Sequence, residues 1–219
     1  MKTSLERRCV AECLGTALLL TAVVGSGIMA ARLSGGNAAL ALLCNTLATG
    51  AILTVLILTF GPLSGAHFNP AVSIAVALRR ELPVADAAVY VGAQLAGAVI
   101  GVWIAHLMFE LPLWQVSATP RTGAGQWLSE VIATFGLLLT IIGCLARTPA
   151  AVPFAVGLYI TSAYWFTAST SFANPAVTVA RSISDTFAGI APTGVIAFVC
   201  AQLLGMLAAV MLARWLWRS

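Results

Sequence analysis

The sequence predicts an all-α, polytopic membrane protein in which six transmembrane helices and two re-entrant half-helices form one domain with an inverted internal repeat. Three observations carry this prediction. Of the 219 residues, 60% are hydrophobic and only 8% are charged. Six apolar stretches are long enough to cross a bilayer, and the same short motifs occur once in each half of the chain.

The composition excludes a soluble globular domain, in which charged residues normally make up about a quarter of the chain. A helix needs about 20 apolar residues to cross the roughly 30 Å of hydrocarbon in a bilayer. The first such stretch runs directly into the others, which is typical of a retained helix and not of a cleaved signal peptide. The predicted spans are residues 10–31, 38–60, 84–108, 127–146, 150–168 and 190–217.

The basic residues predict the orientation, because Lys and Arg are retained in cytoplasmic loops. Six spans place both termini on one side of the membrane. If that side is cytoplasmic, only three of the 11 Lys and Arg residues lie outside, namely Arg32, Arg121 and Arg181. We therefore expect both termini in the cytoplasm. The net charge of +4 is interpreted as a topology signal and as contact with the headgroups of the lipid bilayer, not as nucleic-acid binding.

Three landmarks recur in the same order in the two halves of the chain, approximately residues 1–110 and 120–219. The pairs, at offsets of 118, 105 and 108 residues, are Glu12 with Glu130, Asn69 with Asn174, and Gln94 with Gln202. Because each half holds three spans, an odd number, the second copy must be inserted upside down relative to the first. Inverted repeats of this kind place a solute path near the midplane, between the halves.

An Asn-Pro-Ala sequence marks the start of a short helix in each half. Asparagine is a favoured N-cap, and proline is tolerated at the first helical position because its missing N–H would have no partner there. The apolar runs that follow predict helices of about 12 to 15 Å, close to half the hydrocarbon thickness. Two of them meeting at the midplane would form a seventh, composite span. The motif residues are Asn69, Pro70 and Ala71, and Asn174, Pro175 and Ala176.

The segments before these helix starts bring non-helical backbone to membrane depth, which is allowed only where the backbone is buried or lines a water-filled cavity. We expect their carbonyl groups to form a ladder of acceptors along one wall of a pore, while the amides of Asn69 and Asn174 donate to the passing solute. Each half-helix N-terminus carries roughly half a positive charge, so cations and protons meet a barrier between the two ends. The other expected lining residues are Gly65, Ala66, His67, Phe172 and Ala173.

Two acidic residues, Glu12 and Glu130, lie inside predicted spans. A carboxyl group at that depth needs a partner or a role, and the symmetric placement of this pair favours a structural role over a proton relay. We expect each one to accept hydrogen bonds from backbone N–H groups of a re-entrant segment. Such bonds would fix the direction in which the carbonyl groups of the segment point.

With both motifs in place, the chain resembles the aquaporin and aquaglyceroporin family over essentially its full length. The resemblance lies in Ser-Gly-Ala-His-Phe-Asn-Pro-Ala-Val at 64–72, in its inverted copy around Asn174, and in the flanking Glu and Gln landmarks. It implies an aquaporin-like fold, a homotetramer with one pore in each subunit, and passive passage of water and small neutral solutes. The second copy has no glycine between Ser169 and Ala173, unlike the usual loop of the family, so the course of its backbone is open.

Pores of this family are narrowest at an outer filter, which the resemblance places at Thr49, Ser162, Ser171 and Val177. Family members commonly have a bulky aromatic residue at the first position and an arginine at the last, and this chain has neither. The three hydroxyl groups occupy little volume, and valine replaces a fixed charge by a short apolar surface. The pattern most resembles the arsenic-resistance aquaglyceroporins of bacteria. It implies an inner-membrane channel for arsenous acid, methylated arsenic acids and polyols such as glycerol.

Arg181 lies four residues beyond Val177 and therefore on the same helical face. At 1.5 Å per residue it would sit about 6 Å nearer the outer surface. We expect it in the outer vestibule, solvated or in contact with headgroups, with a substitute role in the filter as the less favoured alternative.

Other functions are less well supported. The five cysteines lack the paired spacing of a metal or redox motif, so we expect neither a metal nor a cofactor. No set of nucleophile, base and ligand accompanies the spans, and no phosphate-binding loop occurs, so we expect no enzyme. A water-selective aquaporin is the first alternative. A coupled secondary transporter also uses inverted repeats and broken helices, but apart from Glu12 and Glu130 the spans offer almost no titratable residue near their middle.

Overall fold

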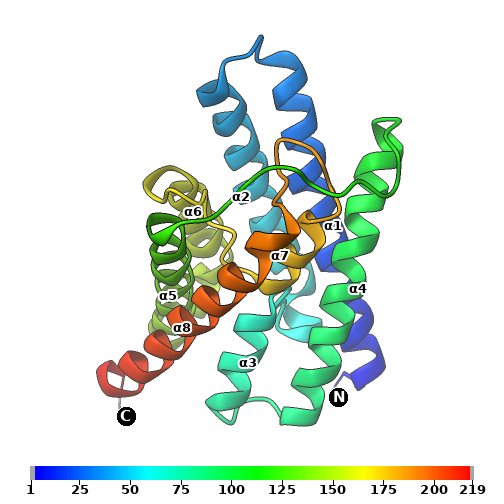
Figure 1. Cartoon of the computed structure of the whole chain (residues 1–219). Coiled ribbons are helices and arrows are strands. Elements are labelled where there is room, and N and C mark those ends of the chain that lie inside the picture. The colour runs from blue at the N-terminus through cyan, green and yellow to red at the C-terminus, as the bar shows by residue number, and fades with distance from the viewer. Residues whose placement is uncertain (1–2, 218–219) are drawn as a thin grey trace.

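The computed structural model describes residues 3–217, and over that range the chain forms helices and loops without a strand (Figure 1). The first half contains α1 (Leu5–Leu33), α2 (Ala38–Ser64), the short α3 (Pro70–Leu78) and α4 (Val84–Met108). The second contains α5 (Ala124–Arg147), the 3₁₀ turn η1 (Pro149–Ala151), α6 (Val152–Phe166), the short α7 (Pro175–Arg181) and α8 (Pro192–Leu216). A half-helix thus follows the second long helix of each half, as predicted.

Five helices of the described range, α1, α2, α4, α5 and α8, are long and apolar enough to cross a membrane. The remaining predicted span is shorter. Helix α6 has 15 residues, which corresponds to about 22 Å, and the 3₁₀ turn before it adds about 6 Å. Together η1 and α6 approach the roughly 30 Å of the hydrocarbon layer.

Helix α2 continues four residues beyond its predicted end, although Pro62 lies in its last turn. Proline removes one hydrogen bond from a helix, but the helix ends only at Gly65. That residue adopts the left-handed conformation, with φ of 89°, and its N–H donates to the carbonyl of Gly61. Glycine is the residue that most readily ends a helix in this way. The re-entrant segment therefore starts at Gly65.

The long helices pack in pairs that have the same partners in both halves. Helix α1 packs along α4, and α5 packs along α8. A Cβ atom added at Gly97 would lie 2.2 Å from the carbonyl oxygen of Cys13, and one added at Gly205 would lie 2.2 Å from that of Val131. Small residues permit this close approach, which drives helix association in lipid.

The two half-helices run in opposite directions from the middle of the bundle. Both ends of the chain lie at the lower end of Figure 1, which is called the terminal end here, and the opposite end is called the distal end. Helix α3 runs toward the terminal end and α7 toward the distal end, and the two helices are in contact. The architecture is the predicted aquaporin-like inverted repeat.

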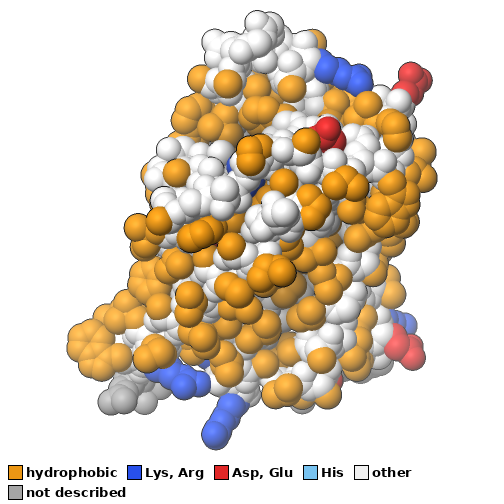
Figure 2. Space-filling model, viewed as in Figure 1, with side chains coloured by type: hydrophobic (Ala, Val, Ile, Leu, Met, Phe, Trp, Pro, Cys, Tyr) orange, Lys and Arg blue, Asp and Glu red, His pale blue; other side chains and the backbone are white. Residues whose placement is uncertain are grey.

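The surface of the bundle is apolar. Hydrophobic side chains cover most of the face in Figure 2, and the few charged side chains on it lie toward the upper and lower ends. Leu158 of α6, Ile196 of α8 and Met211 of α8 are 70%, 77% and 71% exposed. Monomeric soluble proteins rarely expose apolar surface on this scale, so the protein is a multi-pass membrane protein.

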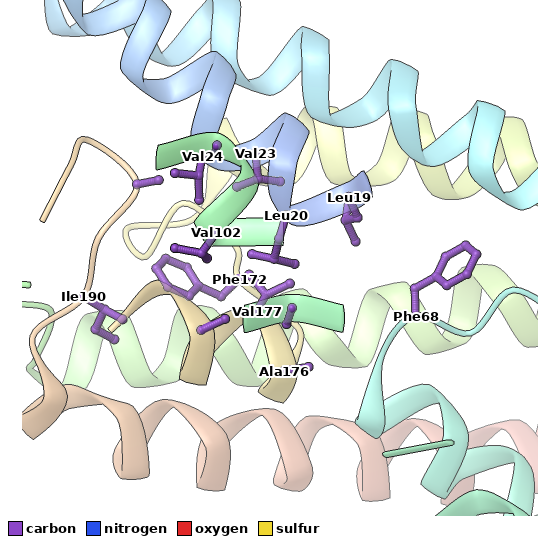
Figure 3. Close-up of a cluster of buried hydrophobic side chains, with 14 of the residues drawn as sticks. Leu19, Leu20, Val23, Val24, Phe68, Val102, Phe172, Ala176, Val177 and Ile190 are labelled. Carbon is purple, nitrogen blue, oxygen red and sulfur yellow. The ribbon is translucent and has the colours of Figure 1, made fainter. Parts of the chain in front are cut away.

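A buried apolar cluster fixes the start of α7. Figure 3 shows Phe172 and Val177 among Leu20 and Val23 from α1 and Val102 from α4. These contacts connect the second half of the chain to the first, so α7 is held by helices that precede it by more than 60 residues.

Candidate solute pathway

Each half-helix begins at an asparagine with extended backbone, as predicted. The side-chain oxygen of Asn69 accepts from the N–H of Ala71 at 2.9 Å, and that of Asn174 accepts from the N–H of Ala176 at 3.0 Å. Both caps therefore satisfy N–H groups that have no partner within the helix. The residues at the first helical positions are Pro70 and Pro175, and both are buried.

The amide groups of the two asparagines connect the half-helices tip to tip. Nδ2 of Asn69 donates to the carbonyl of Ala173 at 2.7 Å, and Nδ2 of Asn174 donates to the carbonyl of Phe68 at 2.8 Å. A side-chain amide has two hydrogens, so each asparagine retains one. We expected these amides to donate to solute. One of the two hydrogens of each amide is instead used to hold the two tips together.

Glu12 organises the first re-entrant segment from a fully buried position. Its Oε1 accepts from Ser64 Oγ at 2.6 Å and from the N–H of His67 at 2.9 Å. Its Oε2 accepts from the N–H of Phe68 at 2.7 Å and from Gln94 Nε2 at 2.8 Å. The expected bonds from backbone N–H groups are confirmed, and all four partners of this carboxyl group are donors.

Glu130 does the same for the second segment. Its Oε1 accepts from Ser169 Oγ at 2.6 Å and from the N–H of Phe172 at 2.9 Å. Its Oε2 accepts from the N–H of Ala173 at 2.8 Å and from Gln202 Nε2 at 2.6 Å. The two networks match residue by residue, which explains why the Glu and Gln landmarks recur together in the sequence.

The two segments follow the same backbone course although only the first contains a glycine. The φ angles are 89°, 50° and 49° for Gly65, Ala66 and Phe68, and 61°, 51° and 48° for Thr170, Ser171 and Ala173. A left-handed conformation costs an ordinary residue about 1–2 kcal/mol. The bonds to Glu130 and Ser169 hold the second segment in this strained form, so the missing glycine does not change its path.

The carbonyl ladder is shorter than we expected. Four carbonyls within residues 64–68 and 169–173 accept hydrogen bonds from the protein itself. Tyr90 Oη donates to Ser64 O at 2.9 Å, Arg121 Nη1 donates to Ser169 O at 3.1 Å, and the asparagines occupy the other two. The expected lining residues Gly65, Ala66, His67, Phe172 and Ala173 all line the cavity described next.

A cavity of about 260 Å³ passes both asparagines. One wall is formed by the re-entrant segments and is polar. His67 belongs to it, and its Nδ1 lies 3.0 Å from Ser73 Oγ. The other wall is aliphatic and comes from α1, α2, α5 and α6, including Leu19, Val23, Leu53, Ile57, Leu137, Ile141, Val156 and Ile160. The lining reaches Glu81 toward the terminal end and Arg181 on the distal side.

Three of the four expected filter residues, Thr49, Ser171 and Val177, line the distal part of this cavity, but Ser162 does not. Ser162 is exposed on the outside of the bundle, and its Oγ donates to the carbonyl of Tyr159 at 2.7 Å. It shares the outer face of α6 with Leu158, four residues earlier. The assignment of Ser162 to the filter is wrong, because counting from Asn174 across a loop loses the phase of the helix.

Tyr164 takes the place that we assigned to Ser162. It is 3% exposed and lines the cavity, with its Oη 3.4 Å from Thr49 Oγ1. Val156, Ile160 and Tyr164 recur every four residues along α6 and all face the cavity. Helical periodicity within the fifth predicted span, residues 150–168, was therefore the signal that could have identified Tyr164. Tyr164 therefore places an aromatic residue in the distal part of the cavity, where the four expected filter residues included none.

Arg181 is not solvated, contrary to our expectation. Its side chain is 2% exposed, its guanidinium carbon lies 3.4 Å from the centre of the Phe172 ring, and Nε donates to the carbonyl of Ala188. The segment after α7 folds back over it, since the N–H of Ile190 donates to the carbonyl of Arg181 at 3.3 Å. This return of the chain buries Arg181 beside the cavity.

A second arginine reaches the same ring from the connection between α4 and α5. Arg121 lies 4.9 Å from the centre of the Phe172 ring, and its Nε donates to the carbonyl of Gly189 at 2.8 Å. Burial lowers the pKa of Arg121, and the nearby Glu130 acts in the opposite direction. Sequence reasoning gave Arg121 no role beyond orientation, and only the folded loops bring it here.

Two half-helices that meet tip to tip inside a bundle of membrane-crossing helices, with a cavity past both tips, define a membrane channel with the aquaporin fold. The chain belongs to the major intrinsic protein family, because the family model described as "Major intrinsic protein" matches residues 1–152.

Similar proteins agree with this membership. The chain is 60% identical to "Aquaglyceroporin AqpS" of Rhizobium meliloti (strain 1021), over 97% of this chain and 91% of that protein. It is 38% identical to the "Glycerol uptake facilitator protein" of Bacillus subtilis (strain 168), over 47% of this chain and 42% of that protein. The solved structure of the aquaglyceroporin from Plasmodium falciparum has the same fold, with a TM-score of 0.73 at 23% identity over 97% of this chain and 95% of that one.

Proposed function

We propose that this protein is a passive channel for small neutral polar solutes, namely glycerol and uncharged hydroxylated arsenic acids, with water as a further permeant. The observation that carries the proposal is the cavity past Asn69 and Asn174, which has one polar and one aliphatic wall. The polar wall offers hydrogen bonds to hydroxyl groups, and the aliphatic wall accommodates the carbon edge of a polyol or the methyl group of a methylated arsenic acid.

Neutral solutes are favoured because charge is disfavoured where the half-helices meet. The N-termini of α3 and α7 both point at the asparagines, and each contributes roughly half a positive charge. The buried carboxyl groups of Glu12 and Glu130 are engaged by donors of the loops and the neighbouring helices. A cation at the midplane therefore meets two positive helix ends.

The distal residues of the cavity suit solutes with several hydroxyl groups. Thr49, Tyr164 and Ser171 supply three hydroxyls around the aliphatic Val177. Ser171 Oγ is buried without a hydrogen-bond partner among the described residues, so a rotation of this side chain toward the cavity would let it bond a solute. Arsenous acid carries three hydroxyl groups, as glycerol does. The names of two relatives, an aquaglyceroporin and a glycerol uptake facilitator, support the same class of solute.

We further propose that the protein is a homotetramer in a bacterial inner membrane, with both termini in the cytoplasm. Most basic residues of the described range lie at the terminal end, among them Arg79, Arg80 and Arg147, and such residues favour the cytoplasmic side. The distal end of the cavity would then face outward. Cross-linking in the membrane, with products of up to four subunits, tests the assembly.

Stopped-flow light scattering of liposomes that contain the purified protein tests the function. After an osmotic shock with glycerol or arsenous acid, we expect rapid shrinkage and then reswelling faster than in protein-free liposomes. Val177→Arg should slow reswelling in both solutes and spare water flow, because arginine adds bulk and charge to the cavity. Val116→Arg, at a position 75% exposed in the distal connection, should behave as the wild type.

Three results would contradict this proposal. Fast shrinkage without reswelling in any solute would identify a water-selective channel. Solute entry that requires an ion gradient would identify a coupled transporter. Equal solute flux in Val177→Arg and the wild type would reject the placement of Val177 in the pathway.

A further inference from the structure

We infer that Arg181 sets the charge selectivity of the distal end of the cavity, where its guanidinium repels cations and offers N–H donors to arriving solutes. The inference rests on the proposed function, since it concerns which solutes the same cavity rejects. It assigns a role in selectivity to a residue that the sequence placed in the outer vestibule, with a role in the filter as the less favoured alternative.

The contacts of Arg181 leave most of its donors unused. Arginine has five N–H donors. The single acceptor that the described residues provide is the carbonyl of Ala188, which is bonded to Nε. Nη1 and Nη2 of Arg181 have no hydrogen-bond partner within residues 3–217, but they are not fully buried. Arg181 also lines the cavity. These two nitrogens therefore present their N–H groups to the cavity.

A buried hydroxyl lies in the same part of the cavity. Ser171 Oγ has no hydrogen-bond partner within residues 3–217, and Ser171 is 2% exposed. Arg181 and Ser171 both line the distal cavity beside Val177. Buried polar groups are almost always hydrogen-bonded, so the free N–H groups of Arg181 favour water or a solute bound to them in the cavity, and rotation of the Ser171 side chain would bring its hydroxyl to the same cavity.

Within residues 3–217, neither Arg181 nor Arg121 forms an ion pair with an acidic side chain. Within the part of the chain that the structure describes, the ion pairs are Arg8 with Asp86 and Arg79 with Glu81, both remote from the distal cavity. The buried Glu130 is engaged by four donors of its own segment and of α8. The positive charge of Arg181, which lines the cavity, is therefore unpaired at this end.

The guanidinium of Arg181 is held in place before any solute arrives. It lies against the ring of Phe172, whose N–H is bonded to Glu130 and whose ring meets Phe198 edge to face at 5.3 Å. Stacking on an aromatic ring and a single bond through Nε fix the plane of the guanidinium and leave its outer edge free. Arg121 is a positioning residue, since it bonds the loop carbonyls of Gly189 and Ser169 around the same ring.

Thiol modification of a cysteine in the distal cavity tests this charge. Val177→Cys in liposomes is treated from outside with two methanethiosulfonates, one with a sulfonate group and one with a trimethylammonium group. Each rate is divided by the rate of the same reagent with free cysteine. The five natural cysteines do not line the cavity, and the wild type supplies their background.

We expect the normalised rate ratio to favour the anionic reagent by at least tenfold. Arg181 lies about 6 Å from Val177 along α7, and a change of reagent charge by two units at that distance alters the rate by about tenfold even at the dielectric constant of water. Adding Arg181→Gln should bring the ratio to within about threefold of free cysteine. Arg181→Lys, which retains the charge, should keep the ratio high.

Arg32→Gln is the matched control, since Arg32 is a distal arginine that is exposed and bonded to the carbonyl of Phe109. It should leave the ratio unchanged. A ratio near that of free cysteine in Val177→Cys alone would overturn the inference, and so would a high ratio that persists in Arg181→Gln. Failure of both reagents to react would overturn it as well, because Arg181 would then meet no solute. Glycerol flux through unmodified Val177→Cys tests the proposed function separately.

Discussion

Replacing Glu130 by glutamine removes one acceptor from a buried site in which every partner is a donor. Oε1 accepts from Ser169 Oγ and the N–H of Phe172, and Oε2 accepts from the N–H of Ala173 and from Gln202. A glutamine side chain presents one oxygen and one NH₂ group. In either orientation the NH₂ group faces a backbone N–H, so Glu130→Gln leaves Phe172 or Ala173 with an unpaired N–H.

The expected loss of stability is substantial. A buried N–H without an acceptor costs about 1–3 kcal/mol, and a hydrogen bond to a charged group contributes about 1.5–3 kcal/mol. These two costs overlap because they concern the same groups, so the total for the segment is about 2–5 kcal/mol. The segment also contains the left-handed residues Thr170, Ser171 and Ala173, whose strain favours other conformations. At 1.4 kcal/mol for each factor of ten, the population of the oriented segment falls by at least about 30-fold relative to its alternatives.

Glycerol reswelling of liposomes, normalised to the amount of inserted protein, measures the consequence. We expect Glu130→Gln to lower glycerol permeability by at least about tenfold and to lower the midpoint of thermal unfolding, since the loss of about 2–5 kcal/mol falls on a buried site. Glu12→Gln should act alike on the first segment. Glu110→Gln, at an exposed position after α4, should change neither quantity. Wild-type permeability together with a wild-type unfolding midpoint in Glu130→Gln would refute the orienting role.

Three further changes probe other parts of the structure. Tyr164→Ala should admit polyols larger than glycerol, while Ser162→Ala should not, and reswelling in erythritol or xylitol distinguishes them; equal effects would restore Ser162 to the pathway. Gly97→Ala places a Cβ 2.2 Å from the carbonyl of Cys13 and should destabilise the protein by about 1–3 kcal/mol, whereas Gly92→Ala in the same helix meets nothing within 4 Å; equal unfolding midpoints would contradict the packing of α1 on α4. Asn174→Asp keeps the cap acceptor but adds negative charge where the half-helices meet, so it should raise the potassium leak of liposomes; a leak equal to that of the wild type would argue against a barrier at the helix tips.

The parts of the site that could be predicted from the sequence are those fixed by local chemistry and by the repeat. Asn-Pro-Ala specifies a capped helix start wherever it occurs, so Asn69 and Asn174 could be placed without a structure. A carboxyl group inside an apolar span requires donors, and the segments beside each motif supply them. The near-constant offsets between halves then predicted two equivalent networks, which the bonds to Glu12 and Glu130 confirm.

The parts that could not be predicted depend on loops and on distant contacts. A fixed count from Asn174 selected Ser162, but the loop after α6 changes the phase between that helix and the motif, and Tyr164 faces the cavity instead. The burial of Arg181 depends on the return of the chain through Ala188 and Ile190. Neither the phase of a helix across a loop nor the path of a returning loop is encoded in the residues next to the motif.

The central claim is that solute passes through the cavity beside the two half-helices. Glycerol flux through Val177→Cys and Ser162→Cys, each treated with a bulky uncharged thiol reagent, tests it most directly, because Val177 lines the cavity and Ser162 lies on the outer surface. We predict that modification abolishes flux in Val177→Cys and leaves it unchanged in Ser162→Cys and in the wild type. Complete labelling of Val177→Cys with glycerol flux intact would contradict the claim.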